Sequence, residues 1–392
     1  MNAYIVAGYR SAVGKAPKGV FRFTRPDDLA ADVIKHLMAQ VPNLDPARVD
    51  DLIVGNAVPE AEQGMQMARY ISLLSLGKSV AGVTVNRYCG SGVETIAMAA
   101  AKISAGMADC IVAGGTESMS MVPTTGWKMA LNYGLASHHP DYYIGMGLTA
   151  EQVAQQFNVT REEQDVFSYN SHVKALAAQA AGKFDGEIVP ITVKETYFDE
   201  ATGKKKNKEY VVTKDEGPRE GTSVEALSKL RPVFAMGGSV TAGNSSQTSD
   251  GAAFVIVMSE RMVNELGLKP IARMMAYTTA GVEPRIMGIG PVAAIPIALK
   301  QAGLKQDDID IIELNEAFAA QSLAVIKELG LDTSKINPNG GAIALGHALG
   351  STGGRLTVQV LNELRRQNKK YGMVTACVGG GQGVAGIYEL LS

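Results

Sequence analysis

The sequence predicts an α/β protein built from two similar halves, with a long insertion. Three observations predict this class: short apolar runs end in Gly, Ala- or Leu-rich helical stretches follow them, and the order of these segments occurs twice. Runs this short and this apolar suit strands that are buried on both faces. The length of 392 residues exceeds one ordinary compact core, so two or three domains are expected.

The expected strands and helices alternate along the chain. Buried strands are predicted over 3–7, 52–55, 110–115, 311–314 and 373–378. Helices are predicted over 92–105, which is rich in Ala, Met and Ile, and over 356–367, where apolar residues recur near helical spacing.

Matching segments indicate that the chain contains an internal duplication. Residues 50–56 (DDLIVGN) resemble residues 310–315 (DIIELN), and residues 83–90 and 336–341 each contribute a strand and a turn before a helix. Two such halves packed together would place two sets of strand ends near one cleft. The predicted division is 1–117 with 244–268 for the N-terminal half, 118–243 for the insertion and 269–392 for the C-terminal half.

The segment 118–243 differs in character from the two halves. It contains Trp127, a charged helical stretch over 149–181 and a polar, lysine-rich stretch over 197–210. We interpret it as a lid or ligand-binding subdomain, and decorative surface structure is the alternative that composition leaves open. The basic run 204–206 is interpreted as a solvated loop or hairpin tip.

Charge and cysteine content narrow the classes of function. A net charge of -2 gives no support for nucleic acid as a partner, and no apolar run is long enough to span a membrane. The start of the chain lacks the features of a secretory signal. An odd number of Cys, three, argues against a disulfide framework and fits a reducing compartment, so a cytoplasmic protein is expected. No metal site is predicted.

Cys89 is the strongest candidate for a nucleophile. It stands in the turn 86–92 (NRYCGSG), between a predicted strand and a predicted helix. The helix dipole and nearby backbone N–H groups would stabilise a thiolate there and lower the pKa of the thiol. The alternative is a buried structural Cys, which is commoner for a Cys taken at random.

The other Cys and the His residues separate by context. Cys110 lies inside an apolar strand and is interpreted as core, whereas Cys377 ends a strand and runs into Gly379-Gly380-Gly381, whose N–H groups can form an oxyanion hole. His347 lies in a Gly-rich loop and is the natural base for a Cys nucleophile. His36 and His172 are interpreted as surface or packing residues.

Asn315 begins a turn directly after a predicted buried strand. Two interpretations of this residue stay open at this point. It could cap the next helix, or it could orient a water molecule or a substrate carbonyl.

Five segments in order resemble the thiolase family. They cover the whole chain, and any one of them alone is a weak signal. The segments are 86–92 (NRYCGSG), 113–120 (AGGTESMS), 315–319 (NEAFA), 339–350 (NGGAIALGHALG) and 377–381 (CVGGG).

The resemblance implies a fold and a reaction. The fold is two duplicated α/β halves in an α-β-α-β-α layered arrangement with an inserted loop subdomain. In the family, the residue matching Cys89 attacks the 3-keto carbon of a 3-ketoacyl-CoA, and the one matching His347 accepts its proton. The residue matching Cys377 protonates the acetyl-CoA enolate and then deprotonates the incoming CoA. This is covalent catalysis of ping-pong type.

Two oxyanion holes follow from the same resemblance. His347 and a water molecule held by Asn315 stabilise the enolate. The backbone N–H groups of Cys89 and Gly379 hold the oxyanion of the acyl-enzyme step, and one such donor contributes about 3–4 kcal/mol.

Coenzyme A is implied as a substrate bound by the insertion, with no permanently bound cofactor. Arg219 matches a residue near the nucleotide, where a cation suits phosphates or an adenine face. Thr222 and Ser246 match other CoA contacts, and Met146 and Met287 match residues of the pantetheine and acyl tunnel, although plain packing explains the two Met almost as well. The family also implies a homodimer or homotetramer, in some members joined to hydratase–dehydrogenase subunits.

Two departures from the family pattern bear on the subtype. Ala348 replaces a common Pro after the catalytic His, which should loosen the loop slightly. Gly145 stands where biosynthetic acetoacetyl-CoA thiolases often carry His. Together with 59–64 and 244–250, Gly145 indicates a degradative 3-ketoacyl-CoA thiolase of fatty acid β-oxidation.

Three rival functions remain at this stage. A biosynthetic acetoacetyl-CoA thiolase is the nearest alternative. A non-catalytic CoA-binding protein would have no reason to keep Cys89, His347 and Cys377 together. A decarboxylating condensing enzyme would need a second active-site His where Asn315 stands.

Overall fold

The computed structural model describes residues 2–392 and contains one large mixed sheet with the strand order β10-β11-β12-β9-β1-β8-β5-β3-β4. The N-terminal half supplies β1 (Ala3–Arg10), β3 (Asp51–Gly55), β4 (Ala81–Val85), β5 (Cys110–Ser118) and β8 (Ser249–Ser259), and the two-residue strand β2 (Gly14–Lys15) pairs with β8. The C-terminal half supplies β9 (Ala272–Gly281), β10 (Ile311–Leu314), β11 (Tyr371–Val378) and β12 (Gln382–Leu390).

The two halves of the sheet have the same topology. The order β1-β8-β5-β3-β4 in one half matches β9-β12-β11-β10 in the other, and a single residue pair, Ile5 with Ala272, joins them. In place of a counterpart to β4, Ile336 forms one isolated parallel bridge to Ile312. The strand expected over 336–341 is therefore reduced to one bridge. The topology agrees with the predicted duplication, and the domain boundaries at 117/118, 243/244 and 268/269 stay predictions.

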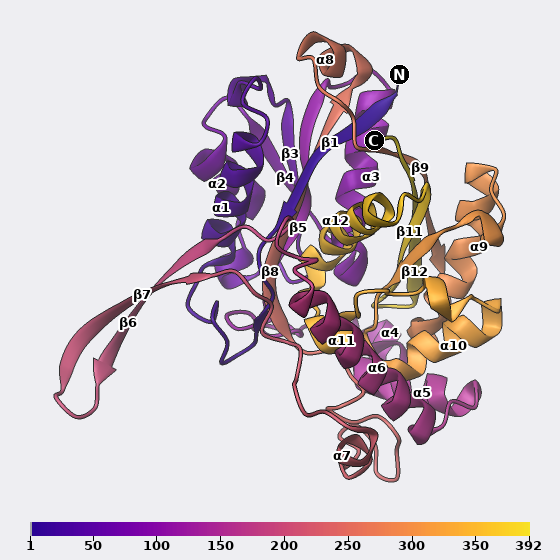
Figure 1. The fold of residues 1–392 in the computed structure, drawn as a ribbon. Coiled ribbons are helices and arrows are strands. Elements are labelled where there is room, and N and C mark those ends of the chain that lie inside the picture. The colour runs from indigo at the N-terminus through magenta and orange to yellow at the C-terminus, as the bar shows by residue number, and fades with distance from the viewer. Residues whose placement is uncertain (1) are drawn as a thin grey trace.

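Helices lie in three layers around the two half-sheets. Two helices, α3 (Ser91–Ser104) and α12 (Leu349–Gln367), pack between the half-sheets, as Figure 1 shows. The outer face of the N-terminal half carries α1 (Pro26–Ala39) and α2 (Met67–Ser75), and that of the C-terminal half carries α9 (Gly290–Ala302) with α10 (Ala319–Leu329) against it. The five-layer α-β-α-β-α arrangement is confirmed.

The two central helices approach closely because glycines face each other. A Cβ on Gly92 would lie 2.6 Å from the backbone N of Gly354, and a Cβ on Gly353 would lie 2.2 Å from the backbone N of Val93. The helix α12 begins at Leu349 and not at the predicted residue 356. Gly lowers helix propensity, so the glycines in its first turns hid the start of the helix from the sequence pattern.

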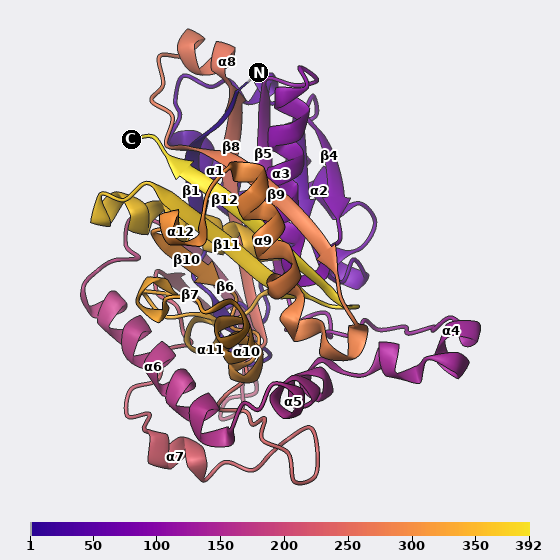
Figure 2. The same ribbon diagram turned by 90° about the vertical axis from the view of Figure 1, so that its right-hand side faces the viewer.

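The insertion consists of helices at one end of the molecule and a projecting ribbon. Figure 2 shows α4 (Tyr133–His138), α5 (Met146–Gln156), α6 (Arg161–Ala180) and α7 (Val224–Ser228) gathered at that end, with α4 extending away from the body. The single helical stretch predicted over 149–181 is wrong. Asn158 has a φ of +50° and breaks it, and Thr160 caps α6 with its side chain on the backbone N–H of Glu163.

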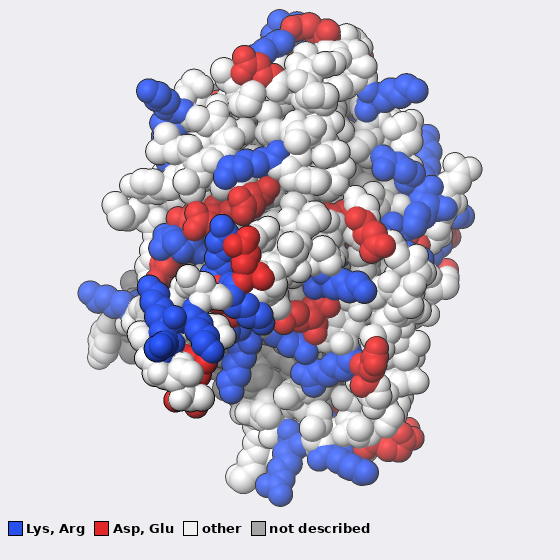
Figure 3. All heavy atoms as spheres, turned by 60° about the vertical axis from the view of Figure 1, so that its left-hand side comes forward, with Lys and Arg blue, Asp and Glu red and all other residues white. Residues whose placement is uncertain are grey.

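The lysine-rich stretch forms the ribbon. β6 (Ile191–Asp199) pairs antiparallel with β7 (Lys204–Val212), and the ribbon projects from the body in Figure 1. The basic run 204–206 is exposed at the start of β7, beside the hairpin tip, as the sequence predicts. Figure 3 brings this side forward and shows Lys and Arg side chains interspersed with carboxylates. Within residues 2–392, no helix is long and apolar enough to cross a membrane.

Candidate active site

Cys89 occupies the turn between β4 and α3. Tyr88 before it has a φ of +42°, and Cys89 is 7% exposed. Burial raises the pKa of the thiol to about 12, although the backbone N–H groups of Gly379 and of Cys89 itself act on the sulfur in the opposite direction. The expectation of a lowered pKa is therefore wrong for this state, because desolvation of the thiolate outweighs the helix N-terminus. The thiol is neutral until a base takes its proton.

Cys377 and Gly379 bring the end of β11 to the same point. Cys377 is fully buried, and burial raises the pKa of its thiol, with a further rise whenever nearby Cys89 is a thiolate. The backbone N–H of Gly379 lies close enough to the sulfur of Cys89 to act on its pKa. Gly380 and Gly381 follow with φ of +79° and +85°, a turn that favours Gly. The two cysteines and the Gly-rich turn thus meet across the two halves.

His347 lies between the short helix α11 (Ala342–Leu345) and α12. Its Nδ1 is 2.7 Å from Thr352 Oγ1, and its Nε2 is 3.4 Å from Asn315 Nδ2. Leu349, two residues further on, packs in the same apolar cluster as Cys89. Burial and then the charge of Arg355 lower the pKa of His347 to about 3, so its imidazole is neutral near pH 7. A neutral imidazole can accept a proton.

Asn315 follows β10 and turns its side chain toward His347. It does not cap the next helix, because Phe318 is the N-cap residue of α10. Its Oδ1 is buried and has no hydrogen-bond partner among residues 2–392, while Gln321 Nε2 donates to its backbone carbonyl at 3.2 Å. A buried amide oxygen without a partner suits a bound water or ligand donor.

Glu316, the next residue, fixes this loop to its surroundings. It is buried and accepts hydrogen bonds from Ser171 Oγ of α6 at 2.6 Å, from Asn337 Nδ2 at 2.8 Å and from the backbone N–H of Ile343 at 3.2 Å. The carboxylate therefore links the Asn315 turn, the insertion and the loop that leads to His347.

The two predicted Met residues lie beside the second cysteine. Met287 belongs to the apolar cluster that contains Cys377 and Phe318, and Met146 packs against that cluster from the N-terminal end of α5. Phe234 of the insertion meets Phe318 edge to face, with ring centroids 6.1 Å apart. The insertion therefore covers the C-terminal half where Cys377 lies.

The three predicted polar CoA residues lie further out. Arg219 is exposed, its backbone N–H donates to His172 Nδ1 at 3.2 Å, and Thr222 Oγ1 donates to its carbonyl at 3.1 Å. Ser246 is half-buried, and its N–H donates to Ala317 O at 2.9 Å, two residues after Asn315. His172 is a packing residue, 4% exposed, with a pKa lowered to about 4 by burial and then by Arg219 and Lys15.

Sequence reasoning missed two residues that contact the His347 loop, Thr352 and Arg355. Both lie in the first two turns of α12, which the sequence pattern did not assign to a helix. Arg355 is 2% exposed and donates to Gly346 O at 3.4 Å. The one signal in the sequence was an Arg next to several Gly at the start of an apolar helical stretch. An Arg that is buried there needs a partner, because Arg is rarely buried without one.

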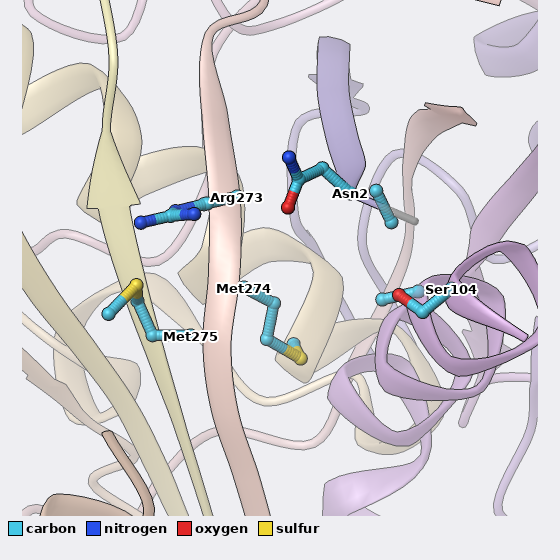
Figure 4. Close-up of a pocket in the computed structure, with 7 residues that line it drawn as sticks. Asn2, Ser104, Arg273, Met274 and Met275 are labelled. Carbon is cyan, nitrogen blue, oxygen red and sulfur yellow. The ribbon is translucent and has the colours of Figure 1, made fainter. Parts of the chain in front are cut away.

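A separate hollow lies away from these residues. It has a volume of about 260 Å³ and is lined by Asn2, Ser104, Arg273 and Met274 among others, as Figure 4 shows. Arg273 is paired with Glu389 at 2.6 Å. None of the predicted catalytic residues lines it, so it is not the candidate active site. No group of three or more His, Cys, Asp or Glu side chains within residues 2–392 is placed to hold a metal ion.

Comparison with known proteins gives the family of this chain. The family model described as "Thiolase, N-terminal domain" matches residues 3–261, and that described as "Thiolase, C-terminal domain" matches residues 268–390. This chain belongs to the thiolase family. It is therefore an acyltransferase.

Individual relatives match the thiolase over its full length. A 3-ketoacyl-CoA thiolase of Bacillus subtilis is 51% identical, with 99% of each chain covered. An acetyl-CoA acetyltransferase of Escherichia coli is 42% identical, with 100% of each chain covered. The crystal structure of the acetyl-CoA acetyltransferase of Bacillus anthracis superposes with a TM-score of 0.89 at 40% identity, covering 100% of this chain and 99% of that one.

Proposed function

We propose that this thiolase cleaves 3-ketoacyl-CoA with CoA to acetyl-CoA and a shortened acyl-CoA, and catalyses the reverse Claisen condensation, through an acyl-enzyme on Cys89. One observation carries the proposal. A buried Cys, a neutral buried His, a second buried Cys and an amide with a free oxygen converge from separate loops of the two halves. A protein that only binds CoA has no use for that combination.

The first half of the reaction forms the acyl-enzyme. His347 takes the proton of the Cys89 thiol, and the thiolate attacks the 3-keto carbon. The backbone N–H groups of Cys89 and Gly379 receive the developing oxyanion. The bond between the α and β carbons then breaks and the acetyl-CoA enolate leaves.

The second half of the reaction handles the enolate and the incoming thiol. His347 and a donor held on Asn315 Oδ1 stabilise the enolate oxygen, and Cys377 gives its proton to the enolate carbon. The thiolate of Cys377 next takes the proton of CoA, whose sulfur accepts the acyl group from Cys89. The raised pKa of Cys377 supports this role, since it returns the thiolate readily to the thiol.

CoA is proposed to lie along the insertion, with Arg219 at the nucleotide, Thr222 and Ser246 beside it, and Met146 and Met287 along the pantetheine. The exposure of Arg219 and the apolar cluster of the two Met with Cys377 support this direction. Arg219→Ala should raise KM for CoA by about tenfold with little change in kcat, because the contact is equal in ground and transition states. An unchanged KM would contradict the placement.

A degradative role with acyl chains longer than four carbons is proposed for this site. Gly145 has a φ of −64°, which any residue can adopt, and a Cβ placed there meets nothing within 4 Å. A Cβ at position 145, beside Met146, therefore has room. The 3-ketoacyl-CoA thiolase relative supports fatty acid β-oxidation as the setting, whereas the acetyl-CoA acetyltransferase relatives favour the biosynthetic alternative.

A chain-length series tests both the reaction and the subtype. Thiolysis of acetoacetyl-CoA and of longer 3-ketoacyl-CoA substrates should give equal or higher kcat/KM for the longer chains. The variant Gly145→His should lower kcat/KM for long chains more than for acetoacetyl-CoA, by roughly tenfold or more, since one methylene contributes about 1–3 kcal/mol. Activity confined to acetoacetyl-CoA would overturn the subtype and leave the thiolase reaction standing.

The proposal extends to the assembly and the compartment. A cytoplasmic homodimer or homotetramer is expected, and sedimentation of the purified chain measures its size. Association with hydratase–dehydrogenase subunits would appear as a larger species when those subunits are added.

A further inference from the structure

The ring of His347 is held between two polar side chains, one at each nitrogen. Thr352 Oγ1 lies 2.7 Å from Nδ1, and Asn315 Nδ2 lies 3.4 Å from Nε2. His347 and Thr352 are both about 95% buried or more. In such a place the neutral imidazole has one proton, and its partners decide which nitrogen carries it.

The hydroxyl of Thr352 has an acceptor for its own hydrogen besides His347. Thr352 Oγ1 donates to the backbone carbonyl of Ala348 at 2.9 Å, the back-bond that Thr makes one turn earlier in a helix. A hydroxyl has one hydrogen and two lone pairs. With the hydrogen placed on Ala348 O, which also accepts the N–H groups of Ser351 and Thr352, the oxygen is left to accept from His347, and the proton of the imidazole is then on Nδ1.

The other nitrogen agrees with this assignment. A neutral imidazole protonated at Nδ1 has a lone pair at Nε2, which can accept from the amide Nδ2 of Asn315. Once the imidazole proton is on Nδ1, the reverse orientation of the amide would face Oδ1 against the Nε2 lone pair, so the two assignments go together. The observed arrangement leaves Oδ1 free for a donor from water or substrate.

The charged groups around the ring keep it in the neutral state where the choice of nitrogen matters. On α12, Arg355 is buried and donates to Gly346 O, the residue before His347. Behind it on β10, Glu313 is 1% exposed, and burial raises the pKa of its carboxyl to about 8, so it is mostly protonated near pH 7 and does not offset the charge of Arg355. Desolvation and the positive charge of Arg355 both oppose a second positive charge on His347.

We propose that Thr352 is a positioning residue that fixes the proton of neutral His347 on Nδ1, so that Nε2 is the atom that takes the proton of Cys89. This rests on the proposed function for its catalytic consequence. The thiol proton moves to Nε2, and the Nδ1–H bond to Thr352 is kept in the cation. The new Nε2–H then points at the enolate oxygen. Without Thr352 the proton of the neutral ring can sit on Nε2, where it blocks the base.

The test compares three variants of α12. Thr352→Val keeps the shape and removes the acceptor, Thr352→Ser keeps the hydroxyl, and Thr357→Val is the matched control. Thr357 is a fully buried Thr on the same helix with the same kind of back-bond, from Oγ1 to Gly353 O at 2.8 Å. We expect Thr352→Val to lower kcat for thiolysis by roughly tenfold to a hundredfold, the usual effect of losing a partner that orients a His. Thr352→Ser should restore kcat to within about threefold of the parent.

A spectroscopic measurement separates positioning from mere packing. The chain has five His, so ¹⁵N-histidine labelling with His347→Gln for assignment should show a protonated Nδ1 and an unprotonated Nε2 in the parent. In Thr352→Val the two signals should move toward each other or exchange. A parent spectrum with the proton on Nε2 overturns the proposal, even if no variant folds. Equal losses of kcat in Thr352→Val and Thr357→Val also overturn it. A parent without thiolysis would instead contradict the proposed function, and the spectrum would still decide the tautomer.

Discussion

The two halves of the molecule share one strand order and carry different chemistry at matching positions. Cys89 stands two residues before α3, and His347 stands two residues before α12. The two halves also share a pair of hydrogen bonds. Asp50 accepts hydrogen bonds from two backbone N–H groups where β5 begins, and Asp310 accepts hydrogen bonds from two backbone N–H groups where β11 begins. The proposed nucleophile and the proposed base therefore occupy the same position of a duplicated unit.

Counting along the matched strands extends the comparison. In the N-terminal half Asp51 pairs with Ile111, and in the C-terminal half Ile311 pairs with Gly372. When these two strand pairs are matched, Gly55 is equivalent to Asn315, and Thr116 is equivalent to Cys377. In the proposed mechanism the N-terminal half contributes the nucleophile Cys89, and the C-terminal half contributes the base, the amide and the second thiol. A duplicated frame brings the loops together, and single residue changes then divide the chemistry between them.

The largest effect is expected for the nucleophile. Cys89→Ala should lower kcat by roughly 10⁶-fold, as removal of a catalytic nucleophile does in other covalent enzymes, and should abolish the acyl adduct. Cys110→Ala is the control, because Cys110 is fully buried in β5 away from the loops. Peptide mass spectrometry after incubation with acyl-CoA locates the adduct. An adduct on Cys377 or Cys110, with Cys89→Ala still active, would contradict the assignment.

Two buried asparagines that follow parallel strands sharpen the contrast between the halves. Asn315 and Asn56 both have a buried Oδ1 without a partner among residues 2–392, but the amide of Asn56 donates to Thr116 O and Glu117 and not to a His. Asn315→Ala should lower kcat by about 10²–10³-fold. Asn56→Ala should mainly lower stability. Steady-state kinetics beside urea unfolding measures both, and similar losses of kcat would remove the distinction.

The pH dependence of stability should also differ between the two matched positions. The pKa of His347 is lowered to about 3, so between pH 6.5 and 3 the unfolded chain binds a proton that the folded chain does not. The free energy of unfolding should therefore fall as the pH falls, by at most about 1.4 kcal/mol per pH unit from this group. His347→Gln should reduce that slope and Cys89→Ala should not, since its thiol is protonated in both states there. Urea unfolding at pH 7, 6 and 5 measures how the free energy of unfolding depends on pH. Equal slopes for the parent and for His347→Gln would contradict the prediction.

The smallest expected effects are changes in the free energy of unfolding at two matching positions. These are Ala348, between His347 and α12, and Gly90, between Cys89 and α3. Ala348 has a φ of −78° and follows the extended residue His347, so Ala348→Pro fits and should add about 0.4–1 kcal/mol to the free energy of unfolding. At the matching place, a Cβ on Gly90 would lie 3.0 Å from Val378 and 3.1 Å from Val384, so Gly90→Ala should destabilise by about 1–3 kcal/mol. Thermal or urea unfolding measures both changes in the free energy of unfolding. The expected opposite signs would show that the two loops are not equivalent.

The strands and the chemical residues of the site could be predicted from the sequence for the same physical reason. Strands buried on both faces read as continuous apolar runs, and a Cys or His beside several Gly stands out because few residues there are needed for packing. Cys89, His347 and Cys377 were found in this way, and the structure brings them together with Asn315.

What the sequence did not reveal depends on contacts between distant segments. The direction of the pKa shift of Cys89 follows from burial by β11 and the insertion, which the turn around Cys89 does not encode. Thr352 lies in a Gly-rich stretch that does not read as helix, and its contact with His347 appears only once α12 is seen to begin at Leu349. The break in the helix of the insertion at Asn158 was missed because the sequence is helical on both sides of it, over Met146–Gln156 and Arg161–Ala180, and no Gly or Pro marks the gap.

The glycine contact between α3 and α12 has a consequence for redesign. Since backbone meets backbone at Gly92, Gly353 and Gly354, the separation of the two helix starts is set by the peptide chain and not by side-chain size. Larger or smaller residues elsewhere in the central layer can change how strongly the protein resists unfolding while the thiol and the imidazole keep their spacing. The acyl specificity of this scaffold can therefore be altered through its surrounding loops, while the positions of Cys89 and His347 stay unchanged.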